Sequence, residues 1–136
     1  MRLLITLSLL ASATPAFAAP DLSGEWLVED KKATVRIGRC GPDWCGRIAR
    51  ILHRDPNWKG NDVNNPNPAL KSRPVIGLPI LTGFKPDASG LTGGRIYDPN
   101  SGKTYRSMLR LNRDGSLKVS GCIAVFCRSQ RWTRAR

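Results

Sequence analysis

The four cysteines are the residues whose spacing most directly suggests chemistry. They form two pairs with the same gap, Cys40 and Cys45 in CGPDWC, and Cys122 and Cys127 in GCIAVFC. Such pairs can be a reactive dithiol, part of a metal site or a covalent cross-link. A redox dithiol usually has two intervening residues with one thiolate at a helix N-terminus, and zinc sites favour a similarly short spacing. Four intervening residues weaken both of these interpretations.

The first 18 residues have the form of a secretory signal peptide. The segment MRLLITLSLLASATPAFA places Arg2 before a short apolar run and ends in the A-x-A form that signal peptidase accepts. Pro20 disfavours cleavage after Ala19, so we predict cleavage after Ala18 and a mature single domain over residues 19–136. The apolar run is well short of the roughly 20 residues that a membrane span needs, and no later segment is long enough. We therefore expect a periplasmic or secreted protein.

An oxidising compartment favours disulfides. Four cysteines allow three pairings. Strand-like runs stand on both sides of Gly41-Pro42-Asp43-Trp44, which is typical of a turn. Cysteines that face each other across a hairpin lie within disulfide reach. We favour Cys40–Cys45 and Cys122–Cys127 over the crossed pairings.

The charge balance favours polyanionic partners. Loss of Arg2 with the signal peptide leaves 21 basic and 10 acidic residues, a net charge of about +11. Such an excess favours contact with nucleic acid, anionic lipid or acidic polymers of the envelope. Because the protein is expected to be exported, we do not expect nucleic acid to be its partner.

The elements that must position these residues read as strands, with no convincing helix. Short runs separated by turn residues are typical of an all-β barrel or sandwich. We predict an eight-stranded antiparallel barrel whose strands run over 24–29, 33–40, 45–53, 75–85, 91–98, 103–112, 116–122 and 127–134.

Alternation along these strands predicts which face is buried. The apolar side chains that share one face are Ile76, Leu78, Ile80, Phe84, Tyr105, Leu109, Leu111, Leu117 and Val119. The opposite face carries Arg106, Arg110 and Lys118. A period of two with one apolar and one basic face fits a closed sheet, whose interior is filled by side chains or holds one small ligand.

The segment Ser23-Gly24-Glu25-Trp26 resembles the G-x-W sequence at the first strand of lipocalins and other calycin barrels. In those barrels the tryptophan closes one end, and a basic residue of the last strand covers it. The resemblance implies barrel closure by Gly24, Trp26 and Trp132, with Arg131 or Arg134 as the covering residue.

Motifs along nearly the whole mature chain resemble, in order, an exported bacterial family of unknown function, DUF2147. They are GEW, CG-x-I, DVNNP at 62–66, RP at 73–74, GL at 77–78, GG-x-IYDP at 93–99, GKTY at 102–105, and the closing GC, FCR and WTR. The resemblance implies a small lipocalin-like β domain in the bacterial envelope. It supplies no catalytic residues.

The long connection from Arg54 to Pro74 is the segment of greatest functional interest. Loops of this length are uncommon in compact domains and are often functional. As a lid over a barrel mouth it would bring Trp58 and Arg73 to a ligand. Alternatively, its Asn and Asp side chains satisfy turn backbone, and Asp62 pairs with Arg73. The candidate ligand-binding residues are Trp58, Asp62, Arg73, Phe84 and Tyr105.

No catalytic or metal-binding constellation stands out in the sequence. His53 is the single histidine, and there is no G-x-S-x-G serine for it to serve. The segment with Asp55 and Asp62 lacks the bidentate Glu that ends a calcium loop. We expect neither enzymatic activity nor a metal or other cofactor.

We therefore expect a binding protein whose barrel holds a small apolar or amphiphilic ligand. The alternative is a packed barrel that binds anionic envelope components through a basic exterior, formed by Arg106, Arg110, Lys118, Arg128 and Arg131. The apolar loop Ile123-Ala124-Val125-Phe126 would then touch lipid or a partner, or cap the barrel. A large internal cavity would favour the first interpretation.

Overall fold

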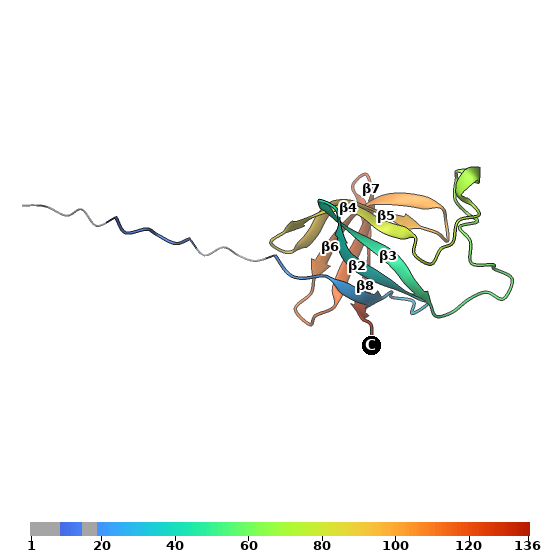
Figure 1. Cartoon of the computed structure of the whole chain (residues 1–136), viewed down its shortest axis with the longest axis horizontal. Helices are drawn as coiled ribbons and strands as arrows, with labels where there is room; N and C mark the ends of the chain where they lie inside the picture. Colours follow the sequence, from blue (N-terminus) through green and yellow to red (C-terminus); the bar gives the residue numbers. More distant parts are fainter. Residues whose placement is uncertain (1–8, 15–18) are drawn as a thin grey trace, which may run out of the picture.

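A computed structural model describes residues 9–14 and 19–136; the predicted cleavage site and most of the predicted signal peptide lie outside the described residues. The described chain forms one closed barrel of eight antiparallel strands, each paired with its neighbours in sequence and the last with the first (Figure 1). The elements are β1 Gly24–Leu27, β2 Ala33–Cys40, β3 Asp43–Ile51, the 3-10 helix η1 Pro68–Leu70, β4 Pro79–Asp87, β5 Gly90–Asp98, β6 Lys103–Leu111, β7 Leu117–Ile123 and β8 Phe126–Arg134. The predicted eight-stranded antiparallel barrel is confirmed.

The start of β4 is the place where the strand prediction was wrong. Val75–Leu78 forms a turn, in which the Gly77 amide donates to the Ile48 carbonyl at 2.7 Å. Gly77 has a φ of +83°, which glycine adopts at no steric cost. Ile76 therefore does not share the buried face, because this turn leaves it 51% exposed.

In β6 and β7 the predicted alternation holds except at Leu111. Leu109, Leu117 and Val119 are buried in the barrel core, whereas Arg106 and Lys118 are exposed. Arg110 stands opposite Lys118 in the register of the two strands, on the outer face. Leu111, predicted to be buried, is 37% exposed at the end of β6.

Both predicted disulfides are confirmed, and each ties a hairpin. Cys122 and Cys127 stand directly opposite each other in the β7–β8 register, with Cα atoms 4.1 Å apart. Cys40 and Cys45 lie diagonally across the β2–β3 hairpin, with Cα atoms 5.8 Å apart. Each link is therefore local and leaves the barrel pairing to the backbone.

The up-and-down strand order gives the barrel two different ends. Turns after β2, β4 and β6 lie at one end, and the connections after β1, β3, β5 and β7 lie at the other. The first end is filled: Phe84 and Leu109 are fully buried there. The Phe84 ring lies so close to Gly94 that a Cβ on that glycine would be 2.4 Å from it. We call this the packed end, and the opposite end the mouth.

Trp26 and Arg134 meet as the resemblance to calycin barrels implied. Trp26 is fully buried and its Nε1 donates to the Leu22 carbonyl at 2.9 Å. The Arg134 guanidinium lies 4.1 Å from the Trp26 ring centroid and donates to the backbone carbonyls of Asp21 and Ser23. A Cβ on Gly24 would lie 2.9 Å from Arg134 Nη1, so glycine admits the cation. Arg134 is the covering residue.

Candidate functional site

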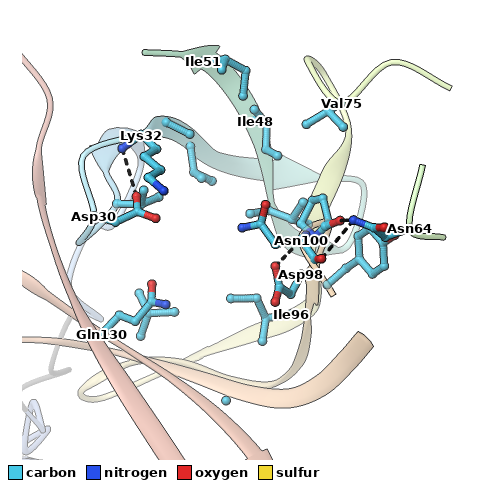
Figure 2. A pocket seen from close by; sticks show the side chains of 18 of the residues that line it. Asp30, Lys32, Ile48, Ile51, Asn64, Val75, Ile96, Asp98, Asn100 and Gln130 are labelled. Atoms are coloured by element: carbon cyan, nitrogen blue, oxygen red, sulfur yellow. Dashed lines mark hydrogen bonds between the residues drawn. The ribbon is translucent and has the colours of Figure 1, made fainter. Parts of the chain in front are cut away.

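A cavity of about 1260 Å³ opens at the mouth of the barrel. Its deep wall is apolar and comes from several strands, because inward-facing residues of each strand converge on the same space. These residues are Val35, Ile48, Ile80, Ile96, Val119 and Trp132. In Figure 2, Ile48 of β3, Ile96 of β5 and Gln130 of β8 point toward this space from different sides. The barrel is therefore hollow in its mouth half.

The adjacent strands β7 and β8 shape the cavity through the size of one residue and the alternation of inward-facing side chains. Gly121 of β7 lines the cavity, and a Cβ there would lie 3.6 Å from both Ile96 and Tyr105, an ordinary contact. A glycine at this position thus leaves room that a larger side chain would fill. On β8, every second residue from the start of the strand lines the cavity: Phe126, Arg128, Gln130 and Trp132.

The prediction that Arg128 belongs to the basic exterior was wrong. This residue was predicted to lie on the outer face, but it stands opposite Gly121 and lines the cavity. Its parity places it in the same inward row as Trp132. Within the described chain it makes no ion pair. Deeper in the row, the Trp132 Nε1 donates to Gln130 Oε1 at 2.9 Å.

The rim of the mouth is polar and carries both signs of charge. The connections after β1 and β3 supply Asp30, Lys32, His53, Arg54 and Asp55, and the end of β5 supplies Asp98. Short contacts order parts of this rim. The Lys32 amide donates to Asp30 Oδ1 at 3.0 Å (Figure 2), and Arg54 lies over the Trp58 ring, 5.5 Å from its centroid.

The connection between β3 and β4 is anchored by a buried carboxylate. Asp62 is fully buried, and accepts hydrogen bonds from the Tyr97 hydroxyl at 2.6 Å, Asn65 Nδ2 at 2.9 Å and Arg73 Nε at 2.9 Å. Burial raises the pKa of Asp62, but these three donors outweigh burial and hold its pKa below the usual range. Burial and the Asp62 carboxylate together raise the pKa of Tyr97. The connection is thus tied to β5.

A second contact ties the same connection to the β5–β6 turn. Asn64 Nδ2 donates to the carbonyls of Pro99 and Asn100 at 3.1 and 3.0 Å (Figure 2). Gly102 packs beneath it so closely that a Cβ there would lie 1.9 Å from the Asn64 carbonyl oxygen. The connection is therefore a fixed part of the rim, and it supplies Trp58 and Val75 to the cavity wall.

The five candidate ligand-binding residues separate into three places. Trp58 and Tyr105 line the cavity. Asp62 and Arg73 form the loop anchor, as the structural alternative proposed, and Phe84 lies at the packed end. The inward row of Arg128 and Gln130 was missed, although its even spacing from Trp132 was visible in the sequence.

Among the described residues, no three His, Cys, Asp or Glu side chains gather closely enough to hold a metal ion. In the same part of the chain, no helix has the length and apolar character needed to cross a membrane.

Comparison with known proteins places both the fold and the family. The barrel matches a solved structure of protein HP1028 from Helicobacter pylori, which is described as belonging to the lipocalin family. The TM-score is 0.73 at 21% sequence identity, covering 85% of this chain and 84% of that one. The predicted lipocalin-like fold is thereby confirmed.

The sequence comparisons identify a family without an assigned activity. No curated protein matches the sequence. The model of DUF2147, described as an uncharacterized protein conserved in bacteria, matches residues 24–134, which is the whole barrel from β1 to β8. The chain therefore belongs to the DUF2147 family, as its ordered motifs predicted.

Proposed function

We propose that this protein is an extracytoplasmic binding protein, and not an enzyme, that holds one small amphiphilic ligand in its barrel. The cavity carries this proposal. Small-molecule sites are concave and mostly apolar, with a few polar groups that orient the ligand. A cavity of about 1260 Å³ with an apolar depth and a polar rim has these properties.

The arrangement of polarity supports an amphiphile with an anionic or strongly polar head. Apolar surface deep in the cavity favours a hydrocarbon chain, because its removal from water stabilises the complex by about 25 cal/mol per Å². Nearer the mouth, Arg128 offers a guanidinium that no carboxylate of the described chain pairs. Guanidinium groups bind carboxylate and phosphate oxygens by paired hydrogen bonds. The hydrocarbon chain of the ligand would point toward Trp132, and its head group toward Arg128.

The disulfides support a site of action outside the cytoplasm. Disulfides persist in oxidising compartments and are rare in the cytosol. Two hairpins of this barrel each carry one, and no cysteine is left free in the described chain. The predicted signal peptide gives the same location by a separate route. The competing interpretation, a fully packed barrel that acts only through its exterior, loses support because the mouth half is hollow.

A fluorescent apolar probe tests the cavity directly. Emission of N-phenyl-1-naphthylamine should rise on binding to the purified protein and fall when dodecanoate displaces it. Gly121→Leu should abolish the signal, because the new side chain enters the cavity beside Ile96 and Tyr105. Gly38→Leu is the matched control, since a Cβ at Gly38 meets nothing within 4 Å and Gly38 does not line the cavity.

The preferred charge of the ligand's head group is tested by competition between two amphiphiles whose hydrocarbon chains are equally long. Dodecanoate should displace the probe at lower concentration than dodecyltrimethylammonium. Arg128→Gln should weaken the binding of dodecanoate by about tenfold, the order expected for a charged hydrogen-bonding pair. The same substitution should leave the binding of dodecyltrimethylammonium unchanged. A wild-type protein that does not bind the probe, or a Gly121→Leu variant that binds it equally well, would refute the proposal.

A further inference from the structure

The β7–β8 hairpin ends in an exposed apolar tip beside the cavity mouth. Ile123, Val125 and Phe126 are 62%, 87% and 79% exposed, and Ala124 between them adopts a φ of +51°. We call residues 123–126 the hairpin tip. Scattered apolar side chains are normal on a surface, but a contiguous group marks a site of interaction with a partner or a membrane.

The hairpin tip is held in a defined position at the edge of the cavity mouth. The Cys122–Cys127 disulfide joins the two strands directly below it. The Arg106 guanidinium donates to the carbonyl of Ala124 within the tip. Because the tip is cross-linked at its base and hydrogen-bonded from β6, its apolar side chains stay exposed to solvent.

The surface beside the tip is cationic. Arg95 of β5 stands directly opposite Arg106 of β6, and both are exposed. Within the described chain neither makes an ion pair, and β6, β7 and β8 contain no Asp or Glu. Like charges directly opposite each other across two strands are unfavourable, so an anion between them would relieve the repulsion.

We propose that the hairpin tip docks the protein on an anionic lipid surface. Apolar side chains that enter the boundary between head groups and acyl chains, with cations at the head-group level, are the two components of interfacial binding. The tip supplies the first component, and Arg95 and Arg106 supply the second. A second copy of the chain fits less well, because a two-fold contact through the tip would bring these arginines toward their own copies.

Docking in this orientation turns the mouth of the cavity to the membrane. Ile123 and Phe126 belong both to the tip and to the cavity wall. An amphiphile could then move between bilayer and barrel along a continuous apolar path. The docking itself does not depend on the proposed ligand, since it uses the outer arginines and Val125, which does not line the cavity.

Co-sedimentation with vesicles tests the docking. The full protein should bind vesicles of phosphatidylglycerol and phosphatidylcholine, and should bind pure phosphatidylcholine vesicles far less. Val125→Asp should weaken binding by at least about tenfold, because the exposed valine that would enter the lipid surface is replaced by a charge that the anionic surface repels. Arg95→Gln and Arg106→Gln should each weaken it by about fivefold at low salt, with a smaller effect at high salt. Val125→Trp should strengthen it.

The control variant is Leu111→Ser, which changes an exposed apolar residue at the packed end. It should bind vesicles like the wild type, while Val125→Asp should still bind N-phenyl-1-naphthylamine, which shows an intact barrel. Equal vesicle binding by wild type and Val125→Asp would overturn the proposal. Sedimentation that reveals a dimer abolished by Val125→Asp, without any vesicle binding, would overturn it in favour of self-association.

Discussion

At the scale of single residues, Asp62 illustrates how a buried charge can serve architecture in a loop that looks functional. The carboxylate is fully buried and takes hydrogen bonds from Tyr97, Asn65 and Arg73. A buried charge is tolerated when paired and hydrogen-bonded, and removing one partner leaves it undercompensated. The same residue types would be expected in a binding site, so sequence alone could not separate the two roles.

Tyr97→Phe should lower the free energy of unfolding by about 1–2 kcal/mol at pH 7, because it removes one donor to the buried Asp62 carboxylate. The pKa of Asp62 is lowered in the folded state from its ordinary 3.8. Its stabilising contribution is therefore present above about pH 4 and is lost as pH falls through the folded-state pKa. The difference between wild type and variant should shrink below about pH 4.

Urea denaturation followed across about pH 2.5–7 measures this difference. Tyr105→Phe is the control, because the Tyr105 hydroxyl makes no hydrogen bond within the described chain although its ring lines the cavity. The free energy of unfolding of this control variant should differ from that of the wild type by less than about 0.5 kcal/mol. A Tyr97→Phe variant as stable as the control at pH 7 would show that this hydroxyl does not anchor the loop.

At the scale of elements, the long connection from β3 to β4 behaves as a fixed part of the rim. Gly102→Ala should detach it from the β5–β6 turn, because a Cβ at that position would lie 1.9 Å from the Asn64 carbonyl oxygen. Gly115→Ala carries the same backbone penalty, with a φ of +85° against +71°, but its Cβ meets nothing within 4 Å. The free energy of unfolding should fall by roughly 1–2 kcal/mol in both variants, because alanine is strained in the left-handed backbone conformation.

Hydrogen exchange separates the two glycine variants. Only Gly102→Ala should speed exchange of the Asp62 and Asn65 amides, which donate to Arg73 and Asp62 carbonyls at 3.0 and 3.2 Å. Unchanged protection of these amides in Gly102→Ala would mean that the β5–β6 turn yields, and that the connection is held by the Asp62 anchor alone.

The hairpin disulfides should add stability without defining the barrel. Removing one by Cys122→Ser/Cys127→Ser should cost about 2 kcal/mol, since a six-residue loop restricts the unfolded chain only modestly. Chemical denaturation should show this loss with an unchanged β-sheet spectrum. Loss of the folded spectrum under native conditions would instead make this covalent link essential to closure of β7 onto β8.

Most of the strand arrangement could be predicted from the sequence, whereas one turn and the cavity could not. Turn residues and alternation located all eight strands, and hairpin geometry gave both disulfides. The error at Val75–Leu78 arose because an apolar run with one glycine is compatible with a strand or a buried turn, and only the contact between Gly77 and Ile48 decides. The cavity was unpredictable because its volume depends on how eight inward rows converge, which no single strand encodes.

At the scale of the whole molecule, the barrel combines a packed end that supplies stability with a hollow end that leaves room for a ligand. Trp26, Phe84 and the β6–β7 leucines fill the packed end. The mouth carries the apolar tip, the cationic Arg95–Arg106 pair and the fixed connection. Under the two proposals above, ligand entry and membrane contact would take place at this same end of the barrel, and both proposals require the protein to be exported.

Export is therefore the last property to test. When the whole chain is expressed in a bacterium and recovered from outside the cytoplasm, its denatured intact mass should correspond to residues 19–136, reduced by four hydrogen atoms for two disulfides. Signal peptidase needs a small residue before the cut, so Ala18→Asp should leave the longer precursor with the cell membrane. Thr14→Asp, which introduces the same charge outside the A-x-A form, should be processed normally. A mass that retains residues 1–18 in the wild type would place the protein at the membrane by its N-terminus, and the hairpin tip would then be a second point of contact.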